Sequence, residues 1–267
     1  MVNYFKDTSL SPQKRAEALV DVLSIEEQAT QLKYDAPAIE RVGLKQYNWW
    51  NEGLHGVARA GTATMFPQAI ALASMFDCER IKKVADITAT EARAKYNAAS
   101  KHGDYDIYKG LTIWSPNINI FRDPRWGRGH ETYGEDPFLT SRLGVSFVKG
   151  LQGEEKTLKT AACAKHFAVH SGPESLRHEF NAIVSPKDLE ETYLPAFETL
   201  VKEGKVESVM GAYNRVNGEP ACASIYLFNK LKEWGFNGYF VSDCWAISDF
   251  HTHHLVTSNA SESAALA

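Results

Sequence analysis

The chain has 267 residues, of which 44% are hydrophobic and 23% are charged, and its formal net charge is −4. This composition is typical of a soluble globular protein with enough apolar material for a sizeable core. The weak negative charge attracts neither nucleic acid nor an anionic membrane surface, and no run of about 18 apolar residues is present to cross a bilayer. We therefore expect no nucleic-acid partner and no membrane span.

Helix and strand patterns alternate from the start of the chain. A helical region is expected over roughly 12–33, where Ser24 and Glu27 have the spacing of a capping box. The aromatic stretch that follows is too interrupted for a helix. Residues 63–74 are predicted as a strand with its exit loop, and apolar periodicity predicts a helix over roughly 78–99.

The middle of the chain continues the alternation. Residues 111–121 are predicted as a strand, and residues 122–137 as a long polar loop. Asp136 followed by Pro137 predicts the start of a helix, because a capping side chain precedes a proline in the first turn. Residues 160–171 are predicted as a strand that ends in polar groups.

The same cap-and-proline signature recurs at Ser185-Pro186 and predicts a helix to about Glu203. The remaining predicted elements are a strand in 206–214, a short helix over 224–234 and a strand in 239–247. Strands that alternate with helices indicate a parallel sheet, and about 250 residues is a typical length for one barrel. We expect an α/β fold, a (β/α)8 TIM-type barrel in a single domain.

The two ends of the chain lead to two further expectations. Residues 257–267 begin like a helix and show no terminator, and a helix of a few residues has little stability alone. We expect the barrel to be incomplete at its C-terminal end. The first residues carry no signal-peptide pattern. The sequence leaves open whether the protein is cytoplasmic, periplasmic or secreted.

The sequence contains no pattern typical of a metal or nucleotide site. Its four cysteines are far apart and form no CxxC pair, so we expect small buried apolar residues rather than zinc ligands or a disulfide framework. The histidines of "HTHH" (251–254) are expected to be solvated. No glycine-rich nucleotide motif follows a strand. We expect no metal and no cofactor.

Polar side chains follow the ends of four predicted strands. These are Asn51-Glu52 with His55, Lys165-His166, Tyr213-Asn214, and Asp243. A carboxylate at the end of an apolar strand is costly unless it is paired or hydrogen-bonded. In a parallel barrel the carboxyl ends of the strands share one face, where active sites lie. The loop 122–137 adds Arg128, while its other charges are expected to brace the loop. The sequence therefore predicts one pocket suited to a polyhydroxylated ring.

Five stretches in chain order resemble glycoside hydrolase family 3, and its β-xylosidase branch in particular. They are "WWNEGLHGV", "RDPRWGRGHETYGEDP", "AKHFAVHS", "SVMGAYNRVNGEPACAS" and "VSDCWAISD". The resemblance covers nearly the whole chain. It implies that 1–267 is an incomplete (β/α)8 catalytic domain, that a second α/β domain is absent from this sequence, and that β-linked sugars are hydrolysed with retention from the non-reducing end.

The resemblance also implies roles for six residues. Asp243 matches the family's nucleophile, Arg128, Lys165, His166 and Tyr213 match residues that hold the sugar in the first subsite, and Glu52 matches the acid that binds its far hydroxyls. The cationic Lys165 and Arg128, with a protonated or hydrogen-bonding His166, are expected to keep the nucleophile ionised. The mechanism needs a second carboxyl group, the acid/base, about 5 to 5.5 Å away. Nothing in the chain matches it, so we expect it beyond residue 267.

The leading hypothesis is a xylan 1,4-β-xylosidase-like enzyme acting on xylo-oligosaccharides. Glu52 favours it, because the resemblance implies the shorter aspartate at this position in members that act on glucosides; alternatively, Glu52 braces His55. A β-glucosidase and an α-L-arabinofuranosidase are the alternatives within the family. The acetylglucosaminidase branch is disfavoured because "KHFAVHSGPES" departs from its "KHFPGHG" motif. Outside the family, Lys165 could form a Schiff base, or the chain could be a non-catalytic sugar-binding module.

Overall fold

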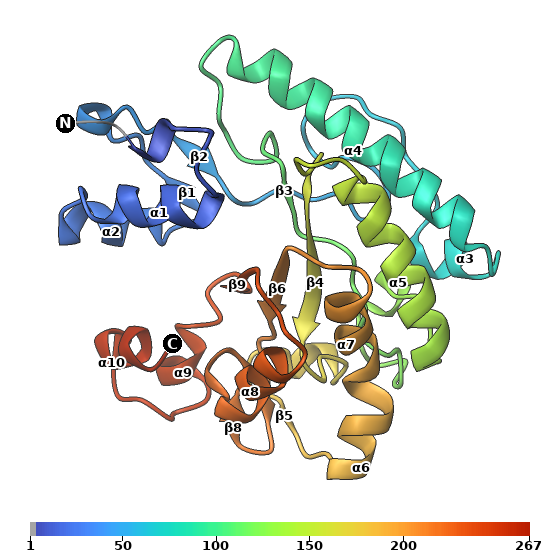
Figure 1. Ribbon diagram of the computed structural model, residues 1–267. Coiled ribbons are helices and arrows are strands. Elements are labelled where there is room, and N and C mark those ends of the chain that lie inside the picture. The colour runs from blue at the N-terminus through green and yellow to red at the C-terminus, as the bar shows by residue number, and fades with distance from the viewer. Residues whose placement is uncertain (1–3) are drawn as a thin grey trace.

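The computed structural model describes residues 4–267 and is built around one parallel sheet (Figure 1). The strand order is β3 (Thr112–Ile113), β4 (Ala161–Phe167), β6 (Ser208–Gly211) and β9 (Tyr239–Ser242), and every neighbouring pair is parallel. Asn51 adds an isolated parallel bridge to Ile113. The predicted α/β class with parallel strands is confirmed. Within residues 4–267 the sheet stays open at β9 and does not close into a barrel.

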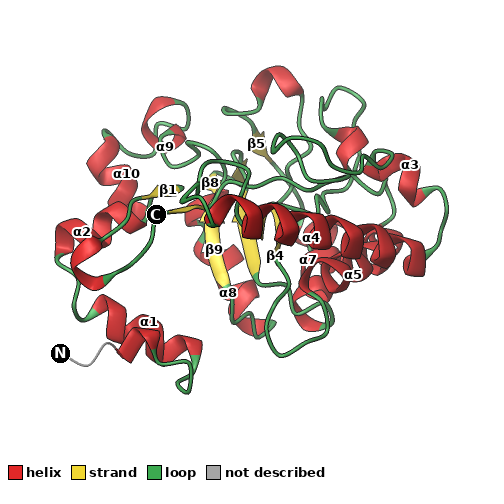
Figure 2. Cartoon of the chain, turned by 90° about the horizontal axis from the view of Figure 1, so that it is seen from above, coloured by secondary structure: helices red, strands yellow, loops and turns green. Residues whose placement is uncertain are grey.

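Helices flank this sheet, and two small sheets lie apart from it. The helices are α1 (Pro12–Val20), α2 (Ile25–Gln31), α3 (Ala69–Ala73), α4 (Cys78–Ser100), α5 (Pro137–Gln152), α6 (Pro186–Asp188), α7 (Pro195–Lys202), α8 (Ile225–Glu233), α9 (Asp249–Thr252) and α10 (Ala260–Leu266). The short strands are β1 (Asp35–Ala36) with β2 (Tyr47–Asn48), and β5 (Asn181–Ala182) with β7 (Arg215–Val216) and β8 (Glu219–Pro220). Figure 2 shows α4, α5 and α7 side by side along the sheet. None of the described helices is long and apolar enough to cross a membrane.

Alternation along the strands sends side chains to two different environments. Ala162 and Ala164 of β4 belong to the large apolar cluster formed with the helices, whereas Cys163 packs with Trp114 and Met210 on the other face of the sheet. Successive residues of a strand point to opposite faces, so Lys165 lies on the same face as Cys163. Val241 of β9 also packs against this second cluster. Asp243 comes two residues later, so its side chain points to the same face as that of Lys165.

The helical side of the sheet is closely packed. A Cβ atom added to Gly150 of α5 would lie 2.3 Å from the carbonyl oxygen of Lys82 in α4, so this glycine allows the two helices to approach each other. The fully buried Leu143, Phe197 and Leu200 belong to the same apolar cluster as the strand alanines. This rigid layer supports the strand ends where the polar clusters lie.

The predicted helix starts are confirmed. The side chain of Asp136 accepts a hydrogen bond from the backbone N–H of Leu139 ahead of α5, and Ser24 with Glu27 forms a complete capping box. The expected helix over 12–33 is two helices, because Ser24 begins the second one after a turn.

Two predicted elements differ from the structure. The strand expected in 63–74 is wrong: this stretch holds α3, whose Ala69, Leu72 and Ala73 are buried at helical spacing. The single helix expected from 186 to 203 is interrupted by a π-helical segment, Leu189–Tyr193. Pro195 has no backbone N–H to donate, which accounts for the wider turn before α7.

Candidate active site

The predicted polar residues lie at one end of the parallel sheet. Lys165 and His166 lie near the C-terminal end of β4, Tyr213 comes two residues after β6, and Asp243 comes directly after β9. The carboxyl ends of parallel strands share one edge. All four side chains are buried, each with 6% or less of its surface exposed. The four residues thus come from the carboxyl ends of three neighbouring strands, but the single pocket predicted for them is divided: Lys165 lines one hollow and Asp243 lines another.

The two oxygens of Asp243 have different surroundings. Oδ1 accepts a hydrogen bond of 2.7 Å from the backbone N–H of Cys244. Oδ2 is buried and has no hydrogen-bond partner among residues 4–267, and it lies 3.5 Å from Nε2 of His166. The carboxylate is thus fixed through one oxygen and available through the other, which is the arrangement that a nucleophile needs.

Asn119 orients His166. Its side-chain nitrogen donates to the carbonyl of His166 at 2.8 Å, so its Oδ1 accepts from the backbone N–H of His166 at 2.8 Å and from the ring Nδ1 at 3.0 Å. The ring then carries its proton on Nδ1, and Nε2 is an acceptor. Burial, and next the charge of Arg128, hold the pKa of His166 well below its ordinary 6.5. Of the two expected states of His166, protonated or hydrogen-bonding, the structure supports the second: a neutral acceptor faces the Asp243 carboxylate, and a hydroxyl group would fit between them.

The loop 122–137 holds its charges in pairs. Arg128 donates two hydrogen bonds of 2.8 Å to the oxygens of Glu131, and Arg125 pairs with Asp123. Burial is the largest single influence on Arg128 and opposes its charge, but the hydrogen bonds and charge of Glu131, together with the charges of Asp243 and Glu52, outweigh it and raise the pKa of the guanidinium. The bracing interpretation of this loop is confirmed, and it extends to Arg128.

Lys165 and Glu52 form an ion pair that lines a hollow near the strand ends. Their Nζ and Oε2 atoms are 3.4 Å apart, and the lysine side chain is only 5% exposed. The two residues line a hollow of about 350 Å³ together with Arg128, Glu131 and Trp50. Nδ1 of His55 instead lies 2.8 Å from the backbone carbonyl of Phe66, so Glu52 pairs with lysine rather than with His55.

Tyr213 packs against His178, which in turn contacts Asp249. Its ring centroid is 4.6 Å from that of His178, whose Nδ1 lies 2.8 Å from Oδ2 of the buried Asp249. Burial, and next the charge of Asp243, raise the pKa of Tyr213. The phenol therefore stays protonated and can donate a hydrogen bond within the cluster.

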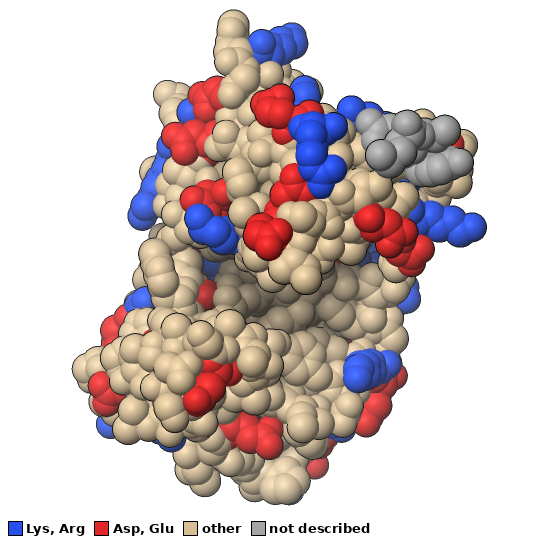
Figure 3. Space-filling view, turned by 90° about the vertical axis from the view of Figure 1, so that its left-hand side faces the viewer, with Lys and Arg blue, Asp and Glu red and all other residues tan. Residues whose placement is uncertain are grey.

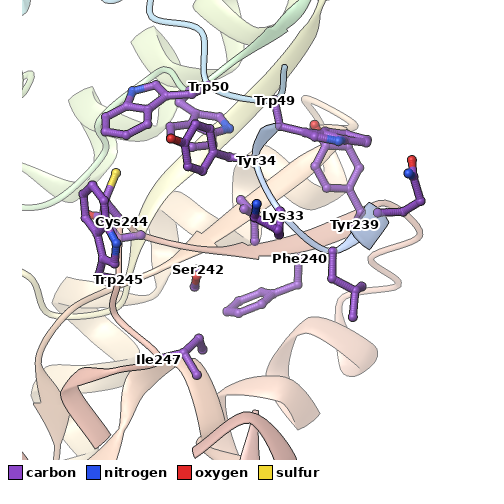
Figure 4. A pocket seen from close by; sticks show the side chains of 15 residues that line it. Lys33, Tyr34, Trp49, Trp50, Tyr239, Phe240, Ser242, Cys244, Trp245 and Ile247 are labelled. Atoms are coloured by element: carbon purple, nitrogen blue, oxygen red, sulfur yellow. The ribbon is translucent and has the colours of Figure 1, made fainter. Parts of the chain in front are cut away.

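An aromatic pocket of about 600 Å³ opens beside Asp243 on the side away from Glu52. Its lining includes Tyr34, Trp49, Trp50, Trp114, Tyr239 and Trp245, and its only charged residues are Lys33 and Asp243. Figure 3 shows a hollow across this face with few charged atoms on its floor, and Figure 4 shows the pocket itself. Trp50 lines both this pocket and the hollow at Glu52.

Neither cysteine nor metal chemistry is apparent in the described part of the chain. All four cysteines are free thiols, and two of them, Cys163 and Cys222, are buried. No group of three or more histidine, cysteine or acidic side chains within residues 4–267 is arranged to hold a metal ion.

The buried histidines make stability depend on pH. Burial holds the pKa of His166 well below 6.5, lowers that of His170 to about 3 and lowers that of His254 to about 4. Below pH 6.5 the unfolded chain binds protons that the folded chain does not, so stability falls as the pH drops toward the folded-state values. At pH 5.5 each of the three histidines is expected to cost about 1.4 kcal/mol, or about 4 kcal/mol together.

Urea unfolding at pH 7.5 and pH 5.5 measures this loss. His170→Gln should remove about a third of it, whereas Val184→Ala, which destabilises without removing a titrating group, should leave the difference unchanged. Equal stability at the two pH values in the wild type would contradict neutral buried histidines.

Residues 26–267 match the model of the glycosyl hydrolase family 3 N terminal domain. The chain belongs to glycosyl hydrolase family 3. It is 49% identical over 267 residues to a xylan 1,4-beta-xylosidase of Xylanibacter ruminicola, an alignment that covers 96% of this chain and 30% of that protein. The chain spans about a third of the length of the curated relatives that it matches.

Two solved structures agree with this assignment. A GH3 exo-beta-xylosidase in complex with a xylobiose aziridine activity-based probe superposes with a TM-score of 0.92 at 35% identity, over 99% of this chain and 36% of that one. A beta-glucosidase from Erythrobacter marinus superposes with a TM-score of 0.83 at 28% identity, over 99% of this chain and 40% of that one. The fold is thus the TIM-barrel-like α/β fold of this family's N-terminal domain.

Two supporting residues were not assigned a role from the sequence. Asn119 orients His166, and Asn117 lies 3.5 Å from Glu131 through its amide nitrogen. Both are buried polar residues two positions apart in the apolar stretch 111–121. Alternate asparagines in an otherwise apolar strand end were the signal for them, because a buried amide requires partners.

Proposed function

We propose that this chain supplies the nucleophile and the sugar-binding subsite of a retaining β-xylosidase that removes terminal xylose from xylo-oligosaccharides. The observation that carries the proposal is Asp243, whose Oδ2 is buried and unpartnered within residues 4–267 while Oδ1 is fixed by a backbone N–H. Attack of Oδ2 on the anomeric carbon would break the glycosidic bond, with the departing oxygen protonated by the acid/base, and form a glycosyl-enzyme that water then hydrolyses.

The surrounding residues provide what the bound sugar needs. Lys165 and Arg128 line the same hollow and supply cationic donors for the sugar hydroxyls, and the protonated phenol of Tyr213 can donate a hydrogen bond. His166 Nε2 and Asp243 Oδ2 are two acceptors 3.5 Å apart, and a sugar hydroxyl would hydrogen-bond between them. This unsatisfied pair supports a polyhydroxylated ligand over a purely structural role.

The acid/base and a second domain are proposed to lie outside residues 1–267. The 600 Å³ pocket beside Asp243 contains no other carboxyl group in the described part of the chain. Glu52 is paired with Lys165, and Glu131 is paired with Arg128, and all four residues line the other hollow. The threefold greater length of the relatives is consistent with a longer enzyme that provides the missing group.

Glu52 is expected to set the preference for pentoses. Its carboxylate extends one methylene further than aspartate into the hollow at Lys165, where a glucose hydroxymethyl group would need space. A mismatch of this size is worth about 1 to 3 kcal/mol, or roughly 10- to 200-fold. In the longer enzyme, kcat/KM for an aryl β-xyloside should exceed that for the β-glucoside by this factor, and Glu52→Asp should reduce the ratio.

Glu174→Asp is the matched control, since it makes the same change in a glutamate that binds Gly127 and Arg177. A wild type that prefers the glucoside, or a ratio that does not respond to Glu52→Asp, would show that another residue sets the specificity. Aryl α-L-arabinofuranosides should be measured in parallel, because a pocket closed to the hydroxymethyl of a pyranose can still admit a furanose.

A further inference from the structure

We propose that one face of helix α4 positions the wall of the hollow at Glu52, and that Glu91 and Lys95 are the positioning residues. The inference rests on the proposed function, because this hollow is where the sugar is proposed to bind. Loop 55–66 follows Glu52 and forms part of the wall. Glu91 and Lys95 contact this loop but do not line the hollow. The loop residues that line it are His55, Gly56, Ala58 and Arg59.

Loop 55–66 is closed by contacts between its own ends. The backbone N–H of Phe66 donates to the carbonyl of His55 at 2.8 Å, and Nδ1 of His55 lies 2.8 Å from the carbonyl oxygen of Phe66. A Cβ atom added to Gly56 would collide with the carbonyl oxygen of Thr64, so the two sides of the loop approach closely. Such a compact loop with adjacent ends is an Ω-loop. Its ends are fixed in this way, but its tip needs further contacts.

Apolar packing does not hold the tip of the loop. None of residues 54–68 is buried, and Met65 is 82% exposed. The backbone of Arg59 has a φ of +59°, in the left-handed region that residues other than glycine adopt infrequently. A strained backbone of this kind persists only where the surrounding structure fixes it. Polar contacts from outside the loop must therefore hold the tip.

Helix α4 supplies these contacts from one face. Glu91 accepts hydrogen bonds from the backbone N–H of Thr64 at 2.9 Å and from its hydroxyl at 2.6 Å. Lys95 donates to the carbonyl of Ala60, the neighbour of Arg59, at 2.7 Å. Residues four positions apart lie on the same side of a helix. In Figure 1 the light-blue chain that follows β2 passes beside α4 before it enters α3.

The tip of the loop is connected to another part of the hollow. The guanidinium of Arg59 donates to the hydroxyl of Tyr108 at 2.9 Å, and both residues line the hollow. Releasing the tip from α4 would lower the fraction of molecules in which this wall is in place, and the apparent affinity for the sugar falls with that fraction. Asp243 lies in the other pocket, to which loop 55–66 does not contribute. The chemical step of a bound sugar is therefore unaffected.

The test measures the rate at which a 2,4-dinitrophenyl 2-deoxy-2-fluoro-β-xyloside labels the 267-residue chain, over a range of sugar concentrations. Lys95→Met removes the donor and keeps the length of the side chain. It should raise the half-saturating concentration about 3- to 10-fold and leave the maximal rate unchanged. Lys95→Arg can still donate to the Ala60 carbonyl and should restore most of the wild-type value. Glu91→Gln loses one of its two acceptor bonds and should shift the half-saturating concentration in the same direction.

Hydrogen exchange of the sugar-free chain gives a second measurement that does not depend on binding. Peptides that cover loop 55–66 should exchange about 3- to 10-fold faster in Lys95→Met, because the tip opens more often. Lys82→Met is the matched control, since Lys82 is on the same helix and pairs with Glu154 instead of the loop. This variant should change neither the exchange of the loop nor the labelling.

The outcomes separate this inference from the proposed function. Unchanged exchange of the loop in Lys95→Met, or faster exchange with an unchanged half-saturating concentration, would overturn the positioning role and leave the proposed function standing. A loss of maximal rate that Lys95→Arg does not restore would also overturn it. If Lys95→Met fails to fold, Glu91→Gln and Lys95→Arg decide by the same criteria. A wild-type chain that the sugar does not label at any concentration would overturn the proposed function, and this inference with it.

Discussion

Asp243→Asn is expected to abolish formation of the glycosyl-enzyme. The amide keeps the shape of the side chain and can still accept from the Cys244 N–H, but it carries no anionic oxygen to attack the anomeric carbon. Removing a nucleophile lowers turnover by orders of magnitude, on the order of 10⁴-fold or more. In the wild type, a 2,4-dinitrophenyl 2-deoxy-2-fluoro-β-xyloside should attach one sugar per chain, visible by intact mass.

Peptide mapping of the labelled chain decides whether Asp243 is the residue modified. Asp249→Asn is the matched control, since Asp249 is also buried and its Oδ2 lies 2.8 Å from Nδ1 of His178 rather than in the pocket. This variant should still be labelled at Asp243. A label on any other carboxylate, or undiminished labelling of Asp243→Asn, would remove Asp243 from the nucleophile's role.

The strand-end residues could be placed from the sequence because two simple rules act together. Alternation fixes the face of each side chain along a strand, and parallel strands bring their carboxyl ends to one edge. Lys165, Tyr213 and Asp243 therefore lie together although 78 residues separate the first from the last. The capped helix starts at Asp136 and Ser24 are equally local, since each cap depends on a side chain three residues from its partner.

Other features depend on contacts that no local pattern carries. The protonation state of His166 depends on Asn119 from a different segment and on burial beside Arg128, so its type and position alone left two states open. The helix α3 forms where an alanine- and leucine-rich run has no strand to pair with, and propensity for helix then prevails. The left-handed backbone of Trp245, at a φ of +60°, follows from the turn after β9.

The chain by itself is expected to cleave only substrates with good leaving groups. Protonation of the leaving group by a general acid contributes about 10²- to 10⁴-fold to the rate, and a dinitrophenolate leaves without it. Within residues 4–267 the aromatic pocket has no carboxyl group except that of Asp243. The nearby Glu52 and Glu131 form ion pairs with Lys165 and Arg128.

The measurement is the rate of glycosylation of the 267-residue chain by 2,4-dinitrophenyl and by phenyl β-xyloside. The dinitrophenyl substrate should give a burst followed by slow turnover, since no base activates the water, whereas phenyl β-xyloside and xylobiose should react at least about 100-fold more slowly. Glu52→Gln and Glu131→Gln should leave this dependence on the leaving group unchanged, whatever they do to sugar binding. Sustained hydrolysis of xylobiose by the chain alone, lost in one of these two variants, would identify an acid/base within it and overturn the assignment of that role to residues outside the chain.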